Sequence, residues 1–169
     1  MTSPFPGPGL DDLVLPDAPA PAGAYERGVV HDGIGFLSGQ FPLRAGTLVH
    51  AGRIGAELTV EDGRFAAGVA ATNVVAGIKA VLGGSLAGLE TLLRVDGYVA
   101  SADDFHGQPW VLDGASEALL RLLGGKGRHA RSAVAVPRLP LNAPVELVVT
   151  FAVTRDARAR RNVGGLRRS

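Results

Sequence analysis

Residues 129–146, HARSAVAVPRLPLNAPVE, hold the pattern that decides the fold. Small and β-branched residues predict a strand at 132–136, which a Leu-Pro-Leu-Asn turn ends. A second strand is predicted at 145–153, where the chain is apolar nearly throughout. If these two strands pair as a hairpin, Arg131 and Glu146 approach one site from neighbouring strands.

Arg131 and Glu146 are the polar groups of this segment that call for an explanation. A carboxylate inside an apolar strand needs either a partner or a function. A guanidinium group can hold a ligand carboxylate with two hydrogen bonds, and a nearby carboxylate can position a water molecule. The alternative is a structural ion pair that joins the hairpin or a subunit interface. Spacing alone leaves both interpretations open.

The elements outside this segment follow from turn and capping signals. Asp32-Gly33 is a strong two-residue hairpin signal, and Arg44-Ala45-Gly46 marks another turn. Thr59 and Asp62 have the spacing of a helix N-cap, and paired glycines end both expected helices. The predicted elements are strands at 26–31 and 34–39, an extended stretch at 41–49, a helix from 59 to 82, a strand at 91–100, a helix at 109–123 and the strands at 132–136 and 145–153.

This element order, β-β-α-β-α-β-β, predicts an α+β fold. Two helices would cover one face of a mixed or antiparallel sheet. The other face would carry apolar side chains as well, Val148 among them. An oligomer that covers this face is the simplest way to bury it.

Both ends of the chain differ in composition from the middle, so three regions are expected. Residues 1–24 hold six of the eleven prolines and are predicted to form an extended arm. Residues 25–153 form the folded domain. Residues 154–169 contain six arginines against Asp156 and are expected to be a solvated tail. No basic cluster lies on the domain itself, so nucleic acid is an improbable partner.

Composition excludes several classes of protein. The 169 residues include no cysteine, which excludes disulfide scaffolds and thiolate chemistry. Charged residues make up 20%, and no apolar stretch is long enough to predict a membrane span or a signal peptide. We therefore expect a cytoplasmic protein. Four histidines, His31, His50, His106 and His129, lack any metal-ligand spacing and are interpreted as surface or loop residues, so no metal site is predicted.

Five stretches of the chain are similar to a known family. They are Phe36–Gln40 with Pro42, Gly55–Glu61, Asn73–Lys79 ahead of Gly83, Val95–Val99 with Phe105, and residues 129–146. Together they resemble the YjgF/RidA-type family of imine and enamine deaminases, also called endoribonuclease L-PSP-like. The likeness covers roughly residues 24–153 and is greatest for a divergent, chorismate-mutase-like subgroup.

The resemblance implies a chorismate-mutase-like fold assembled as a homotrimer, with ligand clefts between subunits. It implies hydrolysis of small 2-imino or enamine acids to 2-keto acids and ammonia, without a metal or organic cofactor. Arg131 matches the arginine that grips the substrate carboxylate, and Glu146 matches the glutamate that positions water. Ser38 and Gly39 match the strand end that lines the cleft, and Tyr25 matches the aromatic residue at its entrance.

Two further site residues depart from the family pattern. Asp113 stands where an asparagine is common, and it could repel a carboxylate or bind the nitrogen of the substrate. Ala133 stands where many members have cysteine. Two alternatives therefore accompany the deaminase: a non-catalytic trimer that binds small carboxylate metabolites in the same clefts and, less favoured, an endoribonuclease.

Overall fold

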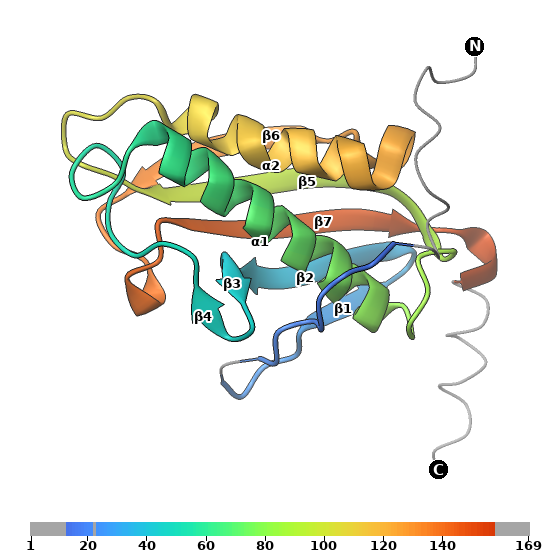
Figure 1. Cartoon of the computed structure of the whole chain (residues 1–169). Coiled ribbons are helices and arrows are strands. Elements are labelled where there is room, and N and C mark those ends of the chain that lie inside the picture. The colour runs from blue at the N-terminus through green and yellow to red at the C-terminus, as the bar shows by residue number, and fades with distance from the viewer. Residues whose placement is uncertain (1–12, 22, 158–169) are drawn as a thin grey trace.

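The computed structural model describes residues 13–21 and 23–157 and confirms the expected mixed α+β architecture (Figure 1). The segments at 1–12 and 158–169, most of the predicted tail among them, lie outside the described residues. The strands are β1 (Gly28–His31), β2 (Ile34–Gln40), β3 (Leu43–Arg44), β4 (Thr47–Leu48), β5 (Leu89–Ala100), β6 (Ala130–Val136) and β7 (Val145–Val153). The helices are α1 (Val60–Val81) and α2 (Gln108–Leu123), with short 3-10 turns η1 (Gly124–Gly127) and η2 (Pro140–Asn142).

The main sheet has the strand order β1-β2-β7-β5-β6, so the expected hairpin of the last two strands is wrong. Strand β5 lies between β6 and β7, pairing parallel with β6 and antiparallel with β7. The reason is the helix that joins β5 to β6, because a helical crossover returns the chain parallel to the strand it left. β7 then takes the central position, where its continuous apolar face is buried.

Local turn and capping signals are confirmed. Asp32 and Gly33 have φ values of 50° and 84°, and Ala45 and Gly46 have 47° and 80°. Two consecutive positive φ values give the turn that matches the twist of paired strands. Thr59 caps α1 in a reciprocal capping box, since its hydroxyl accepts the Asp62 amide while the Asp62 carboxylate accepts the Thr59 amide.

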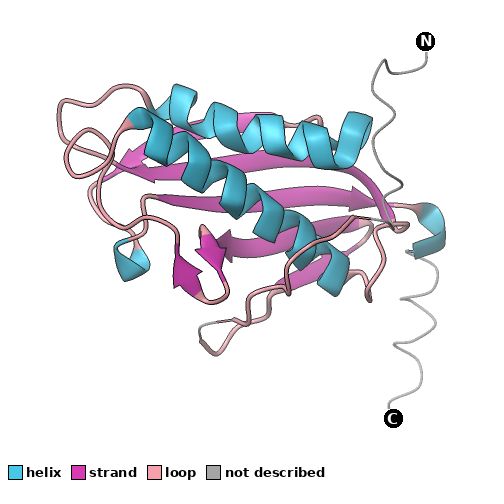
Figure 2. Ribbon diagram, viewed as in Figure 1, coloured by secondary structure: helices cyan, strands magenta, loops and turns pink. Residues whose placement is uncertain are grey.

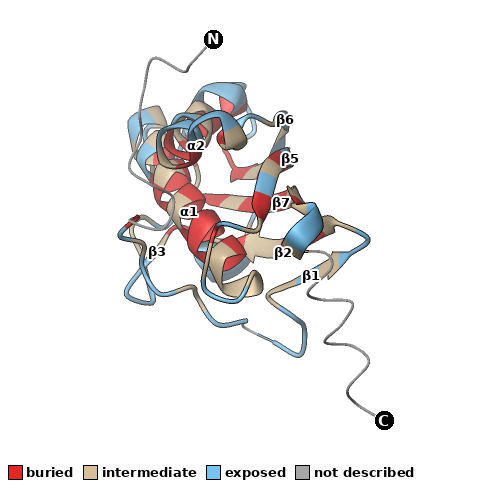
Figure 3. Cartoon of the chain, turned by 90° about the vertical axis from the view of Figure 1, so that its right-hand side faces the viewer, coloured by how far each residue is buried: buried red, intermediate tan, exposed pale blue. Residues whose placement is uncertain are grey.

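Both helices cover one face of the sheet (Figure 2) and leave the other without a covering layer (Figure 3). Alternate residues of β7 are buried beneath the helices, among them Leu147 and Phe151, whereas Glu146 and Val148 face the other side and are half-buried. Phe36 on β2 is 50% exposed on that same uncovered face. The predicted apolar, uncovered face is therefore present in the chain.

Two glycines bring α2 close to its neighbours. A Cβ atom at Gly114 would overlap the backbone carbonyl of Arg64 on α1, and one at Gly97 on β5 would overlap the Leu112 side chain. Neither position leaves room for a side chain. As a consequence, the first turns of α2 are held firmly beside β5 and the start of β6.

The described part of the arm, residues 13–21, runs over the domain without regular secondary structure. Leu13 belongs to the hydrophobic core cluster. Arg27 donates from Nε to the Pro19 carbonyl at 3.2 Å and from Nη2 to the Ala18 carbonyl at 3.3 Å. This stretch thus packs against its own chain. Among the described residues, no helix is long and apolar enough to span a membrane.

Candidate functional site

The structure separates the predicted site residues into two groups. Arg131, Asp113 and Ala133 lie together where β6 passes beneath α2; we call them the arginine half-site. Glu146, Gly39, Ser38 and Tyr25 gather near the end of β2; we call them the glutamate half-site.

The Arg131 guanidinium is held by three acceptors. Nη1 donates to Asp113 Oδ1 at 3.0 Å and to Ser116 Oγ at 2.9 Å, and Nη2 donates to the Pro109 carbonyl at 3.2 Å. A guanidinium group carries five N–H bonds, so two remain for a ligand. Asp113 and Ser116 stand three residues apart on α2 and therefore share one helix face. The group is pre-oriented, and the Asp113 carboxylate opposes its charge.

The Asp113 carboxylate also belongs to a wider ionic network. Arg64 on α1 lies with Nη1 3.9 Å from Asp113 Oδ2 and donates from Nη2 to Glu117 Oε1 at 2.8 Å. Asp113 is thus shared between two guanidinium groups. Ala133 lies two residues beyond Arg131 on the same face of β6 and packs against the core.

In the glutamate half-site, the Glu146 carboxylate lies directly against Gly39. A Cβ atom at position 39 would overlap Glu146 Oε1. Burial raises the pKa of the Glu146 carboxyl above its ordinary value, because partial removal from water disfavours the charged form. A carboxyl group with a raised pKa is better suited to accept a proton from water.

Ser38 and Tyr25 line a cavity of about 160 Å³ next to Gly39. The Ser38 hydroxyl donates to the Glu26 carbonyl at 2.8 Å, and the Ser38 amide donates to the Arg27 carbonyl at 2.9 Å. Both Ser38 donors are therefore engaged within the chain, so only the acceptor side of its hydroxyl is open to a ligand. Tyr25 is 52% exposed at the border of the cavity.

One chain does not bring the two half-sites together. Arg131 points to the helices, whereas Glu146 alternates with buried residues and points to the uncovered face. Arg131 pairs with Val95 and Glu146 with Tyr98, on opposite sides of β5 and three residues apart. From strand spacing and rise, the two Cα atoms are separated by about 14 Å.

Comparison with known proteins shows which family this chain resembles. The family described as “YjgF/chorismate_mutase-like, putative endoribonuclease” matches residues 9–154. The chain belongs to this family. Among curated proteins, Protein TCP17 of Trypanosoma cruzi is 38% identical over 136 residues, which cover 80% of this chain and 84% of that protein.

Two solved structures of similar proteins have the same fold. The protein Atu1372 of Agrobacterium tumefaciens, described as having unknown function, is 33% identical, with a TM-score of 0.79 over 85% of this chain and 87% of that one. A “putative endoribonuclease” of Shewanella oneidensis is also 33% identical, with a TM-score of 0.78 over 83% and 92% of the two chains. The chorismate-mutase-like YjgF fold is thereby confirmed.

Sequence reasoning missed two polar residues of this YjgF-family chain. The Ser116 hydroxyl bonds His129 Nε2 at 3.1 Å, and His129 Nδ1 bonds the Gly127 carbonyl at 2.7 Å. His129 lies in the loop before β6, consistent with its interpretation as a surface or loop residue, but both of its ring nitrogens make hydrogen bonds. The available signal was spacing, because His129 stands two residues before Arg131 on extended chain, while Asp113 and Ser116 share one helix face.

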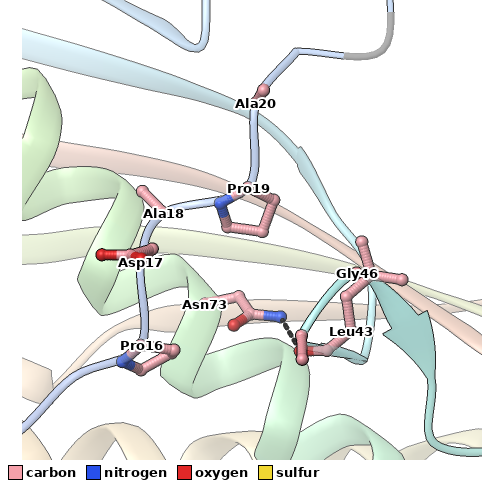
Figure 4. A pocket seen from close by; sticks show the side chains of 9 residues that line it. Pro16, Asp17, Ala18, Pro19, Ala20, Leu43, Gly46 and Asn73 are labelled. Carbon is pink, nitrogen blue, oxygen red and sulfur yellow. Dashed lines mark hydrogen bonds between the residues drawn. The ribbon is translucent and has the colours of Figure 1, made fainter.

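A cavity of about 620 Å³ lies between the arm and the β3–β4 ribbon and not at either half-site (Figure 4). Its buried polar residue is Asn73, whose Nδ2 donates to the Phe41 and Leu43 carbonyls at 2.9 Å each. These hydrogen bonds explain why a polar residue is buried at position 73, because Asn73 supports the β3–β4 ribbon. Within residues 13–21 and 23–157, no group of three or more histidine, aspartate or glutamate residues could hold a metal ion.

Proposed function

We propose that the protein is a hydrolytic deaminase of small 2-imino or enamine acids, acting at sites where the arginine half-site of one subunit meets the glutamate half-site of the next. The observation that carries the proposal is the Arg131 guanidinium, fixed by Asp113, Ser116 and Pro109 with two N–H bonds unengaged. A fixed cation with a free pair of donors is suited to a small carboxylate.

The chemistry requires little beyond orientation. Water adds to the C2 carbon of the protonated imine, and the C–N bond then breaks, so that R–C(=NH2+)–COO− and H2O become R–CO–COO− and NH4+. Glu146 holds the attacking water and takes its proton, which then passes to the departing nitrogen. Arg131 holds the carboxylate next to the reacting carbon and Ala133 borders it, while Ser38, Gly39 and Tyr25 enclose the remainder.

Assembly as a homotrimer, which the family resemblance implies, is part of the same proposal. Arg131 and Glu146 face opposite sides of one sheet, so a shared site needs two copies of the chain. The uncovered face that carries Glu146 and Phe36 is apolar enough to be buried by a second copy. In a closed ring, each subunit would contribute one half-site to each of two clefts.

Asp113 is proposed to contact the nitrogen of the substrate. Its Oδ1 atom accepts from Arg131, and the carboxylate keeps lone pairs for a further donor. A protonated imine offers N–H groups to this carboxylate, whereas the keto acid product does not. Asp113 would then favour substrate over product.

The test is a coupled assay. An amino-acid oxidase generates the imine, semicarbazide traps it, and the protein competes with the trap for the imine. Wild type should lower the yield of trapped imine, and Arg131→Ala should lose this effect. Arg128→Ala is the matched control, because it removes an exposed arginine three residues away.

The binding-only alternative is favoured by one observation, the Asp113–Arg131 ion pair, which lowers the positive charge offered to a carboxylate. It predicts that wild type binds 2-oxobutyrate yet does not accelerate imine decay. Glu146→Gln separates the two functions further, since it should stop turnover and leave binding largely intact. A wild-type rate in Glu146→Gln would show that Glu146 does not activate water.

The endoribonuclease in the printed name of the family has a separate test. The chain without residues 154–169 is incubated with RNA after extensive purification. Persistent cleavage would favour ribonuclease activity of the domain, and its loss would attribute cleavage to the basic tail or to a contaminant.

A further inference from the structure

A chain of hydrogen bonds continues from Arg131 through Ser116 to His129, which the proposed function does not use. Arg131 Nη1 bonds Ser116 Oγ at 2.9 Å, Ser116 Oγ bonds His129 Nε2 at 3.1 Å, and His129 Nδ1 bonds the Gly127 carbonyl at 2.7 Å. Three segments contribute, since Ser116 lies on α2, Gly127 ends η1, and His129 immediately precedes β6.

With a neutral His129 imidazole, chemistry fixes the direction of every hydrogen bond in this chain. A carbonyl oxygen only accepts, so His129 Nδ1 carries the hydrogen. In the neutral imidazole, Nε2 then has a lone pair and accepts the Ser116 hydroxyl hydrogen. The Ser116 oxygen keeps its lone pairs for Arg131, which has only donors. This single arrangement of hydrogens satisfies Arg131, Ser116, His129 and the Gly127 carbonyl.

We propose that Ser116 and His129 are positioning residues for Arg131, which fix the guanidinium so that its two remaining N–H bonds face the ligand carboxylate. The inference rests on the proposed function in taking a small carboxylate as the ligand. Ser116 acts directly on Arg131, and His129 acts through Ser116 by holding the hydroxyl hydrogen away from the guanidinium.

Asp113 alone does not supply this function. It carries a charge that attracts the guanidinium but also competes with a ligand carboxylate, and it is shared with Arg64. Ser116 is a neutral acceptor, so it orients Nη1 without cancelling the charge of Arg131. The Ser116–His129 pair therefore orients the Arg131 guanidinium, and Asp113 sets the net charge beside it.

Isosteric variants test the chain link by link, with 2-oxobutyrate as the probe and titration calorimetry as the measurement. Ser116→Ala removes the acceptor, and Ser116→Thr keeps a hydroxyl. A glutamine at 129 reaches the position of Nε2 and can still accept from Ser116, whereas an asparagine reaches only the position of Nδ1. We expect about fivefold weaker binding for Ser116→Ala and His129→Asn, as for the loss of one hydrogen bond, and near wild-type binding for Ser116→Thr and His129→Gln.

Two readouts distinguish a positioning role from a loss of structure. Thermal unfolding shows whether each of the four variants is folded. Ser116→Thr and His129→Gln must also bind 2-oxobutyrate more tightly than Ser116→Ala and His129→Asn. Equal binding by all four variants and wild type would overturn the positioning proposal while leaving Arg131 as the carboxylate anchor. Wild type that fails to bind 2-oxobutyrate, or Arg131→Ala that binds as well as wild type, would contradict the proposed function instead.

A second measurement tests the Arg131–Ser116–His129 hydrogen bonds without any ligand. Nitrogen-15 NMR should place the hydrogen of neutral His129 on Nδ1, and Arg131 guanidinium N–H signals should exchange slowly in wild type and faster in Ser116→Ala. An Nε2–H tautomer, or guanidinium signals that do not change in Ser116→Ala, would overturn the proposal.

Discussion

Arg131 and Glu146 project from opposite faces of one sheet, and strand β5 separates the strands that carry them. Their Cα atoms, about 14 Å apart by strand geometry, cannot serve one small ligand across a packed sheet. The two half-sites are complementary in charge and in proposed role. The relationship favours a site that two subunits share.

A shared site predicts complementation between inactive variants. Arg131→Ala and Glu146→Gln subunits, each inactive alone, are co-expressed with different affinity tags, and mixed oligomers are purified through both. In a mixed trimer of either composition, one cleft in about three joins an intact arginine half-site to an intact glutamate half-site. We therefore expect up to about a third of the wild-type deaminase rate.

The matched control for this experiment mixes Arg131→Ala with an Asp113→Ala, Arg131→Ala double variant. Both changes affect the same half-site, so no cleft becomes complete. If the Arg131→Ala and Glu146→Gln mixture stays as inactive as this control, the two residues do not meet between subunits.

Gly39 predicts a steric route to the loss of activity. A methyl group at position 39 would occupy the place of Glu146 Oε1, so Gly39→Ala must displace the carboxylate or shift β2. We expect Gly39→Ala to lose most of its deaminase activity and about 1–3 kcal/mol of unfolding free energy, as in other overpacked sites. Denaturant unfolding and the coupled assay measure the two effects.

Gly125→Ala is the control, since a Cβ atom there meets nothing within 4 Å. Its activity should equal that of wild type. A fully active Gly39→Ala would mean that the position of the Glu146 carboxylate is unimportant for turnover.

Neutralising Asp113 should strengthen carboxylate binding. Asp113→Asn keeps an oxygen acceptor for Arg131 Nη1 and removes the negative charge 3.0 Å from it. For a partly exposed ion pair the expected gain is about two- to fivefold in affinity for 2-oxobutyrate, measured by calorimetry. Glu117→Gln is the control, because Glu117 bonds Arg64 and lies one position beyond Ser116. Unchanged or weaker binding by Asp113→Asn would show that Asp113 does not compete with the ligand.

The elements that sequence alone predicted well depend on neighbours in the chain. The Asp32-Gly33 turn and the Thr59 capping box are decided within four residues, and both are confirmed. The pairing of β6 was not predictable in this way. Its position depends on the crossover through α2, and a turn of Leu-Pro-Leu-Asn is compatible with either arrangement.

In the candidate site, too, features set by neighbouring residues were predictable and those set by distant segments were not. The sequence pattern singled out Arg131 and Glu146 and the resemblance gave them roles, but no local pattern indicated that they would face opposite sides of the sheet. His129 lies in a loop, but its bond to Ser116 was not predictable because Ser116 stands 13 positions earlier in another element. Ser38 was expected to line the cleft, and the sequence did not indicate that its amide donates to the carbonyl of Arg27, just before β1. Such contacts are set by tertiary packing.

Glu146 gives a prediction about pH with a definite sign. Burial raises the pKa of its carboxyl in the folded chain, so the folded state binds this proton more tightly than the unfolded state. The resulting stability is present below the unfolded-state pKa and is lost as pH rises through the raised folded-state pKa. Glu146→Gln cannot ionise. We expect its Tm to match wild type in acid, below the ordinary glutamate range, and to exceed wild type at neutral pH.

Calorimetric unfolding at the two pH values measures this difference, and Glu90→Gln, at an exposed position on β5, serves as the control. The same pKa should appear in catalysis, because Glu146 must be ionised to take a proton from water. The deaminase rate should therefore fall as pH decreases through the raised pKa, at a higher pH than for an ordinary glutamate. An equal change in Tm at both pH values would contradict the assignment, since a packing effect of glutamine does not depend on ionisation.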